Sequence, residues 1–239
     1  MDKEDKIILS YFSGIGDILQ FSTLPARFTE LGYKVYVSDQ SLFRNPEIET
    51  LVYDLNPFIL GKVKAPPNCG DGANIKLEHK TGSFIGDWEL AHGLEPRGKY
   101  PEIYYKPKFD RLVSDKILMD ITSISGKNIY DPQILKEFLH RNYTGNNILT
   151  CCFQSDMCSH ILSMDEYDAI HVPNIFYYCN LIHSCKKLVT LHSGAMVMAS
   201  ALKKYGELDV DCLVTYHPIH TLGFINHHHF YDNINYIWI

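Results

Sequence analysis

The sequence predicts an α/β protein built from two small doubly wound domains, each with a parallel sheet, that face each other across a cleft. Three observations predict this class. Short apolar segments rich in β formers alternate with amphipathic segments at helical spacing from residue 6 onward. A polar stretch with several prolines, at residues 95–108, divides the chain near its middle. The alternation restarts after it, so we place one domain at residues 1–110 and the other at residues 111–239.

The first half begins with an expected strand at residues 6–12, whose apolar run is typical of a buried parallel strand. A helix is expected over residues 18–31, because apolar side chains recur there at helical spacing and Gly32 provides a stop signal. The other elements expected in this half are a strand at 34–38, a helix at 46–53 after an Asn45 cap, a looser stretch at 56–83 and a helix at 83–94.

The second half repeats this pattern without any repeat of sequence. Asp131 and Pro132, as cap and first helical residue, open a helix that runs to about residue 139. Small residues at 193–194 open another helix, over residues 195–204. The other elements expected here are strands at 116–121, 147–153, 170–172, 187–191, 210–216 and 233–239, and a helix at 174–185. Because strands joined through helices pair in parallel, both halves are expected to be βαβ units with right-handed crossovers.

Composition excludes several classes of protein. With 46% hydrophobic and 21% charged residues among 239, the chain has the composition of a typical globular protein. The formal net charge of −6 argues against a general nucleic-acid binder. The seven cysteines, an odd number with no C-x-x-C pair, fit neither a disulfide framework nor a zinc ribbon, so we expect them to be reduced and mostly structural.

The chain shows no segment suited to a membrane. No run approaches the ~18 apolar residues that would span a bilayer, and no signal-peptide pattern precedes residue 7. We therefore expect no integral membrane segment. The charges of mixed sign over residues 1–6 favour a cytoplasmic protein.

The first candidate site is the turn Ser13-Gly14-Ile15-Gly16-Asp17, between the first strand and the first helix. Glycines there let the backbone approach a ligand, and Asp17 is placed where a ligand hydroxyl or phosphate could lie. The turn lacks the third glycine of a dinucleotide-binding fingerprint, since Leu19 stands at that position. It also lacks the lysine of a P-loop. A plain helix-capping role for Asp17 remains the alternative.

Two further candidate sites follow strands of the second half. Thr122, Ser123 and Lys127 lie in a polar turn whose hydroxyls and amine suit a phosphate, although an ordinary turn would have the same composition. The turn His192-Ser193-Gly194 opens a helix whose N-terminal N–H groups favour an anion. It is not a nucleophile elbow, which would need glycine two positions before the serine.

The histidines gather in the last third of the chain, including the run at 227–229. Adjacent histidines cannot easily all face one ion, and no acidic or cysteine ligand follows at a recognisable spacing. We therefore expect no metal site and no cofactor.

Taken together, the three sites resemble the motifs of the heptosyltransferase-like glycosyltransferases of family 9. The matching pieces are the turn at 14–17 with the helix that follows, the turn at 123–127, and residues 191–201, which resemble the family pattern D-S-G-x-x-H-L-A-x-A. The resemblance spans most of the chain, and its first and last motifs are the more specific. His192 stands where the family often has an acidic residue, and Met198 departs from the leucine of the pattern.

This resemblance implies a GT-B fold of two Rossmann-like domains, with the acceptor on the N-terminal domain and a nucleotide-sugar donor on the C-terminal one. Asp17 would match the catalytic base of an inverting, metal-independent transfer. Ser13, Gly14 and Gly16 would line the acceptor side. The donor would be bound by Thr122, Ser123, Lys127, His192, Ser193 and Gly194, with the helix start stabilising the leaving diphosphate.

The sugar, the nucleotide and the acceptor stay undetermined at this stage. A glycan, a lipid-linked glycan, a protein and a nucleobase are all compatible acceptors, and a homo-oligomer is also compatible. Two other functions fit the same features. One is a non-catalytic GT-B-like protein that binds a sugar nucleotide, motivated by the strand-like C-terminus where the family has a helix. The other is a nucleotide-sugar epimerase of the 2-epimerase kind.

Overall fold

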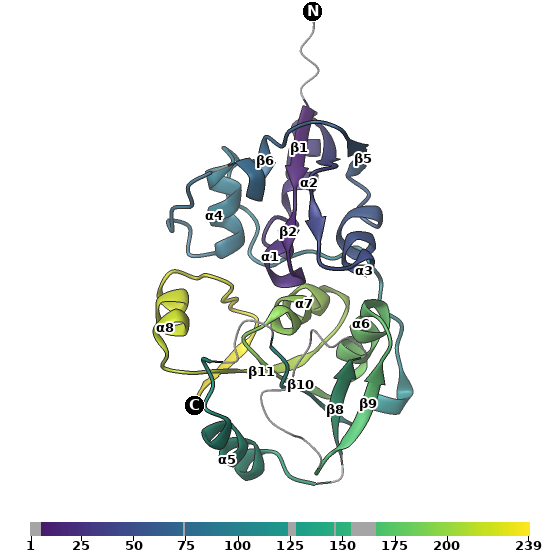
Figure 1. Cartoon of the computed structure of the whole chain (residues 1–239), viewed down its shortest axis with the longest axis vertical. Coiled ribbons are helices and arrows are strands. Elements are labelled where there is room, and N and C mark those ends of the chain that lie inside the picture. The colour runs from purple at the N-terminus through teal and green to yellow at the C-terminus, as the bar shows by residue number, and fades with distance from the viewer. Residues whose placement is uncertain (1–5, 74, 124–127, 146, 154–165) are drawn as a thin grey trace, which may run out of the picture. The chain divides into compact units, whose positions relative to one another are not determined.

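A computed structural model describes residues 6–73, 75–123, 128–145, 147–153 and 166–239 of the chain (Figure 1). The chain divides into two compact units. The first unit consists of Met1–Tyr105 and Asn226–Tyr231, and the second of Lys106–Ile225 and Asp232–Ile239. The division therefore falls five residues before the boundary expected from the sequence, and the first unit includes a short segment from near the end of the chain. Lys127 lies outside the described residues.

The first unit contains a parallel sheet of four strands in the order β5-β3-β1-β6. These strands are β1 (Lys6–Ser10), β3 (Lys34–Ser38), β5 (Ile59–Val63) and β6 (Cys69–Gly70). The chain builds outward from β1 to β3 and β5 on one side and then crosses to β6 on the other. A second, two-stranded parallel pairing joins β2 (Phe12–Ser13) to β4 (Leu42–Phe43). The prediction of a looser stretch at 56–83 was wrong in part, because β5 and β6 lie within it.

The helices of the first unit are α1 (Ile15–Leu19), α2 (Leu24–Glu30), α3 (Pro46–Glu49) and α4 (Phe84–Ala91), and α3 continues into a π-helical turn at Thr50–Asp54. The single helix expected over residues 18–31 is broken between α1 and α2. Pro25 lies in the first turn of α2 and has no N–H with which to continue a helix from α1. Asn45 caps α3 as expected, since its side chain accepts a hydrogen bond from the Ile48 N–H at 2.9 Å.

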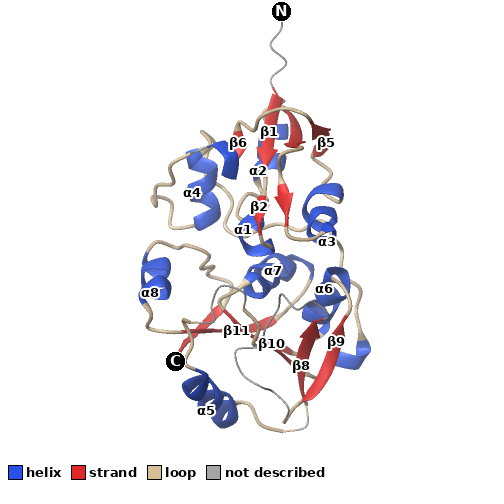
Figure 2. Cartoon of the chain, viewed as in Figure 1, coloured by secondary structure: helices blue, strands red, loops and turns tan. Residues whose placement is uncertain are grey.

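The second unit contains a parallel sheet of six strands in the order β12-β11-β10-β7-β8-β9. The strands are β7 (Ile117–Asp120), β8 (Ile148–Phe153), β9 (Asp168–Val172), β10 (Lys187–Leu191), β11 (Asp209–Val214) and β12 (Asn235–Trp238). Read in chain order, this arrangement is 3-2-1-4-5-6, the strand order of a Rossmann fold. All six were expected from the sequence. Figure 2 labels β8, β9, β10 and β11 among them, drawn in red.

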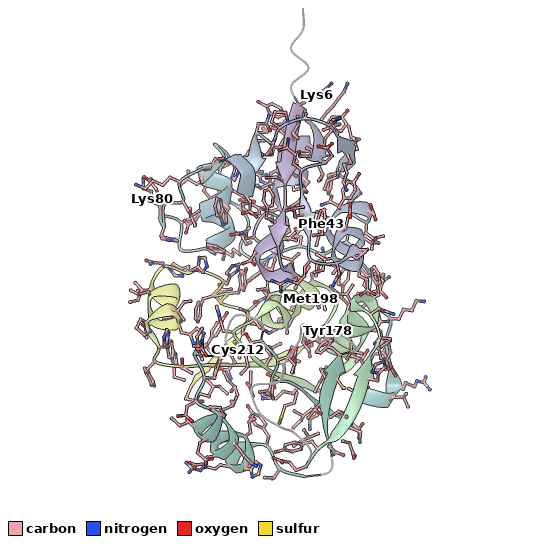
Figure 3. All side chains as sticks on the ribbon, viewed as in Figure 1. Lys6, Phe43, Lys80, Tyr178, Met198 and Cys212 are labelled. Carbon is pink, nitrogen blue, oxygen red and sulfur yellow. The ribbon has the colours of Figure 1, made fainter. Side chains whose placement is uncertain are left out.

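Helices of the second unit are α5 (Pro132–Asn142), α6 (Ile175–Ser184), α7 (Gly194–Leu202) and α8 (Pro218–Ile225). On one face of the sheet Leu135 and Leu139 of α5 pack in a buried cluster with Met119, Val189 and Leu213. Neighbouring strand residues point to the opposite face, where α7 contacts β10 and β11. The sheet is thus covered by helices on both faces, as parallel sheets usually are. Tyr178, Met198 and Cys212, labelled in Figure 3, are all buried.

The cysteine side chains agree with a structural role. Cys69, Cys151, Cys179, Cys185 and Cys212 are buried free thiols and Cys152 is an exposed one. Burial raises the pKa of Cys179 and Cys185 to about 12, so these two thiols stay protonated at neutral pH. In the part of the chain that the structure describes, no helix combines the length and the apolar composition needed to cross a bilayer.

Candidate functional site

Each of the two larger sheets has one topological switch point, where the connections from two neighbouring strands run in opposite directions. In the first unit it lies between β1 and β6, and in the second between β7 and β10. Ligands of open parallel sheets bind beyond the carboxyl ends of the strands at this point, because the loops diverge there and leave a crevice. The residues that leave these four strands are therefore the candidate site residues.

In the first unit, the turn predicted as a ligand site follows the carboxyl end of β1, after the short strand β2. Gly14 is the N-cap of α1 and makes no side-chain cap, and the guanidinium of Arg44 lies against it: a Cβ on Gly14 would be 3.0 Å from the nearer nitrogen. Gly16 and Asp17 follow in the first turn of α1. The Asp17 side chain is 52% exposed, so its carboxylate can be reached from solvent. Ser13 closes β2 directly before this turn.

The other strand of this switch point, β6, delivers a second carboxylate that the sequence did not single out. Asp71 follows Gly70, and its Oδ2 accepts a hydrogen bond from the Phe12 N–H at 3.3 Å. The pKa of Asp71 is raised to about 6. Desolvation of its carboxyl group is the main cause, the negative charge of Asp17 adds to it, and the hydrogen bond from Phe12 acts in the opposite direction. The residue as a whole is exposed, but its carboxyl group lies against the β1 turn. The switch point of the first unit therefore carries two carboxylates.

Gly70 is what allows β6 to end so close to β1. Its φ is +81°, and a Cβ there would lie 2.6 Å from the backbone oxygen of Ser10. Only glycine fits this backbone conformation and this approach. The Cys69-Gly70-Asp71 segment is thus a second case of the pattern that drew attention to Gly16-Asp17, and it is the signal by which Asp71 could have been found.

In the second unit, β7 ends at Asp120, a buried carboxylate that organises the turn after it. Its Oδ1 accepts hydrogen bonds from the Thr122 N–H at 3.0 Å and from the Thr122 hydroxyl at 2.5 Å. Its Oδ2 accepts a hydrogen bond from the Tyr178 hydroxyl of α6. Thr122 and Ser123 are both buried. The Thr122 hydroxyl therefore holds the turn in place through Asp120.

The neighbouring strand β10 ends in the turn His192-Ser193-Gly194. Ser193 caps α7, since its Oγ accepts a hydrogen bond from the Ala195 N–H at 3.3 Å. The His192 N–H donates to the Tyr130 hydroxyl at 3.0 Å, and the His192 ring lies 5.1 Å from the ring of His220. Because Thr190 pairs with Asp120 in register, the two turns leave the sheet side by side.

His220, on the unpredicted helix α8, is the buried neighbour of this turn. Its Nδ1 accepts a hydrogen bond from the Thr215 N–H at 3.0 Å. Burial lowers the pKa of His220 to about 4, and the positive charge of His217 contributes in the same direction. The imidazole is therefore neutral at physiological pH, which suits a structural role beside His192.

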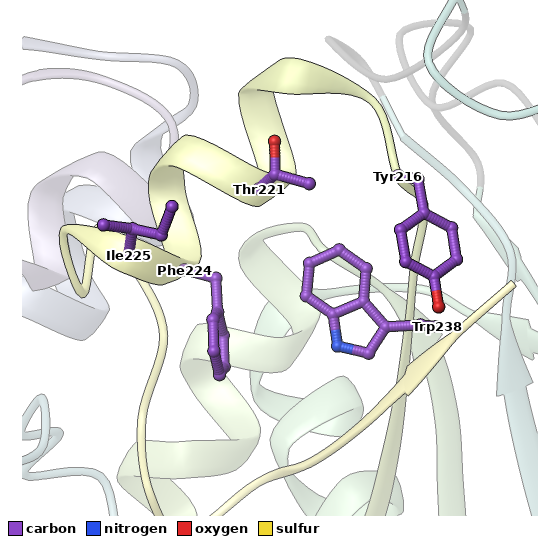
Figure 4. A pocket seen from close by; sticks show the side chains of 5 residues that line it. All are labelled: Tyr216, Thr221, Phe224, Ile225 and Trp238. Carbon is purple, nitrogen blue, oxygen red and sulfur yellow. The ribbon is translucent and has the colours of Figure 1, made fainter.

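An open apolar pocket lies beyond the carboxyl ends of β11 and β12 (Figure 4). It has a volume of about 340 Å³ and is lined by Tyr216, Thr221, Phe224, Ile225 and Trp238. The Trp238 ring lies 5.2 Å from that of Tyr216 and 5.7 Å from that of Phe224. Three aromatic rings thus line a hollow on the same edge of the sheet as the β10 turn.

The structure thus gathers the predicted residues into two groups, one in each unit. Ser13, Gly14, Gly16 and Asp17 lie at the first switch point, and Thr122, Ser123, His192, Ser193 and Gly194 lie at the second. Within the described residues, no three side chains of the metal-ligating types are grouped as a metal site would require.

Known structures share this fold. The chain is similar over 98% of its length to 85% of the family 9 glycosyltransferase from Veillonella parvula, with a TM-score of 0.60 and 9% identity. It is similar over 97% of its length to 90% of the ADP-heptose lipopolysaccharide heptosyltransferase II of Escherichia coli, with a TM-score of 0.57 and 12% identity. The chain has the fold of the heptosyltransferases.

A third similar structure is the iron-containing dodecameric glycosyltransferase TibC of enterotoxigenic Escherichia coli, with a TM-score of 0.57 and 13% identity. The similarity extends over 88% of the chain, which spans only 59% of the length of TibC. No protein-family model and no curated protein matches the sequence. The fold of two parallel-sheet α/β units expected from the sequence is thereby confirmed, as is its likeness to the heptosyltransferases.

Proposed function

We propose that the chain is a glycosyltransferase that moves a sugar from a nucleotide-sugar donor to an acceptor hydroxyl with inversion. The observation that carries this proposal is the position of the motif residues: in a chain with the heptosyltransferase fold, they occupy the switch points of both sheets. A fold alone hosts many activities, so the argument depends on these sites.

Asp17 is the proposed general base. Its exposed carboxylate would accept the proton of the acceptor hydroxyl as that oxygen forms a bond to the anomeric carbon. The bond between the anomeric carbon and the diphosphate oxygen breaks in the same step, and its electron pair leaves with the nucleoside diphosphate. Attack on the face opposite the leaving group inverts the anomeric centre. Ser13, Gly14 and Gly16 shape the acceptor side of this turn.

The second switch point is the proposed donor site. The start of α7 at Ser193 and Gly194 presents backbone N–H groups and the positive end of a nine-residue helix to the diphosphate. The neighbouring turn, which Thr122 holds in place through Asp120, adds the hydroxyl group of Ser123. Lys127, outside the described residues, is its proposed cation.

The aromatic pocket beyond β11 and β12 is the proposed seat of the nucleobase. Parallel strands lie ~4.8 Å apart, so the end of β12 is roughly 10 Å from the end of β10. A nucleoside diphosphate separates its base from its phosphates by a comparable distance. Aromatic rings such as Trp238 stack on bases of any identity. The donor would then lie along the sheet edge, from base pocket to helix start.

The remaining expectations stay predictions. Two of the similar structures are described as a dodecamer, which is compatible with a homo-oligomer here, and one of them holds ADP-D-β-D-heptose. That ligand makes an ADP-linked sugar the first donor to test. The independence from metal and cofactor and the cytoplasmic location stay predictions from the sequence, and the acceptor stays undetermined.

The test is a thermal-shift screen of nucleoside diphosphates and nucleotide sugars, followed by transfer assays with the donors that bind. We expect a nucleoside diphosphate to raise the Tm, because a ligand that binds only the folded state stabilises it. Asp17→Asn should keep that shift and lower transfer by about 10²- to 10⁴-fold. Asp54→Asn is the matched control, since Asp54 is an exposed carboxylate of the same unit that bonds only the Thr50 hydroxyl in the contacts described.

Three outcomes contradict the proposal. If no nucleotide or nucleotide sugar binds at millimolar concentration, the donor site is not there. Binding without turnover of any donor would instead indicate a sugar-nucleotide binding protein. Conversion of the donor sugar without an acceptor would indicate an epimerase.

A further inference from the structure

The segment Asn226–Tyr231 belongs to the first unit, although the residues before and after it belong to the second. Within it, His227 and His229 have φ values of 55° and 54°, in the left-handed region that residues with a side chain rarely adopt. No other non-glycine residue of the described chain has a positive φ. Such a conformation persists only where the surroundings impose it, and it is most frequent at functional sites.

Phe84 holds this segment in place. Its fully buried ring lies 4.6 Å from the ring of His228 and 4.7 Å from that of His229. Phe84 begins α4, and the start of α4 is fixed by the Ser83 cap and by buried Asp87, whose Oδ1 accepts hydrogen bonds from the N–H groups of Lys80 and Thr81. The two imidazoles therefore pack against an aromatic ring that is itself held in place.

Packed against Phe84, the His229 ring lies beside Asp17. The Nε2 of His229 lies 3.8 Å from Oδ1 of Asp17, and the His229 side chain is only 11% exposed. This distance is longer than a hydrogen bond, so the ring and the carboxylate are in contact without a direct hydrogen bond. The same carboxylate acts on His228. Burial lowers the pKa of His228 and His79 lowers it further, whereas the negative charge of Asp17 raises it.

We propose that His229 is a positioning residue for Asp17, which it holds in the orientation that proton abstraction requires. The proposal rests on the proposed function, in which Asp17 is the base. Asp71, after β6, is close enough to Asp17 for the two carboxylates to interact electrostatically, and the Arg44 guanidinium lies over Gly14 in the same turn. The buried imidazole of His229, in contact with Asp17, restricts the orientations open to this carboxylate.

The first arm of the test needs no activity. The ring resonances of the histidines are followed by NMR through a pH titration of the full chain and of its Asp17→Asn variant. We expect the midpoint for His228 to fall in the variant, because the charge that opposes its lowering is gone, and the His229 ring resonances to move with it. The exposed His227 serves as an internal reference and should not respond.

The second arm measures transfer by His229→Gln, with His227→Gln as the matched control in the same segment and the same backbone conformation. We expect His229→Gln to lower kcat by about 10- to 100-fold while the donor KM stays unchanged, because the donor is bound by the other unit. The control should stay within about twofold, the range expected of an exposed side chain outside the site.

The outcomes separate the two proposals. Equal losses in both variants, or none in His229→Gln, would overturn the positioning role. If His229→Gln does not fold, the NMR arm decides, and unchanged His228 and His229 resonances in Asp17→Asn overturn the proposal. If the wild-type chain transfers no sugar while those resonances move, the proposed function fails and the contact between His229 and Asp17 stands.

Discussion

Tyr178→Phe tests whether the buried carboxylate of Asp120, at the second switch point, depends on the hydrogen bond that the Tyr178 hydroxyl donates to it. Asp120 is 3% exposed and Tyr178 is 5% exposed, so water cannot replace this hydroxyl without rearrangement. Asp120 also accepts hydrogen bonds from the N–H and the hydroxyl of Thr122, on the turn itself. The substitution keeps the ring and removes only the oxygen.

The expected cost follows from the kind of bond that is lost. Loss of a hydrogen bond to a charged group costs about 1.5–3 kcal/mol. The void left by one oxygen is small. We therefore expect the free energy of unfolding to fall by about 2–3 kcal/mol, which for a chain of this size is a Tm shift of roughly 4–12 °C.

The assay is urea unfolding followed by circular dichroism, with Tyr177→Phe as the control. Tyr177 is the neighbouring residue of the same helix, is only partly buried, and donates a long hydrogen bond of 3.4 Å to Asp110. Its loss should cost less than about 0.5 kcal/mol. If Tyr178→Phe costs no more than Tyr177→Phe, Asp120 does not depend on that hydroxyl and the reasoning is refuted.

Three further predictions concern the sites. Gly70→Ala should lower the free energy of unfolding by about 2 kcal/mol or more, because its Cβ would meet the Ser10 carbonyl oxygen, whereas Gly82→Ala, also at positive φ but with open space around it, should cost about 1 kcal/mol in urea unfolding. Since the pKa of Asp71 is raised to about 6 in the folded state, ionising it is unfavourable to folding, and stability falls as pH rises from about 4 to about 6. Asp71→Asn should therefore gain stability relative to wild type between pH 4 and pH 7.5, by about 1 kcal/mol because the side chain is partly solvated; a constant difference between the two across that range would contradict this. Trp238→Ala should weaken nucleoside diphosphate binding by about 1–3 kcal/mol in calorimetry without affecting binding of inorganic pyrophosphate, and equal losses for both ligands would argue against base stacking.

The sequence was most informative where a small-residue turn follows an apolar strand. The turns at Gly14–Asp17 and His192–Gly194 were recognisable because strand, turn and helix signals are local. The two edge strands of the first sheet, β5 and β6, were missed, since β6 has two residues and both strands contain glycine. Helix α8 was missed because its apolar residues lie all around it and leave no helical stripe.

The partners of Asp17 could not be predicted for a different reason. Asp71 and His229 are respectively 54 and 212 residues away along the chain (71 − 17 and 229 − 17), and no local pattern reports a contact at such separations. The run of histidines was considered only as a set of metal ligands. In the structure His228 and His229 pack against Phe84, and His229 also contacts Asp17.

The late segment of the first unit has a consequence for how the protein is made. A ribosome delivers residues 1–105 early, but the first unit also needs Asn226–Tyr231, which is synthesised only after 120 intervening residues (225 − 106 + 1). Phe230 and Tyr231 are almost fully buried, so the unit lacks part of its core until then. We therefore expect that the first unit cannot complete its folding before residues 226–231 have been synthesised. A fragment that ends at residue 105 should behave as a partly folded species, and a chaperone that binds nascent chains would meet that species during every round of translation.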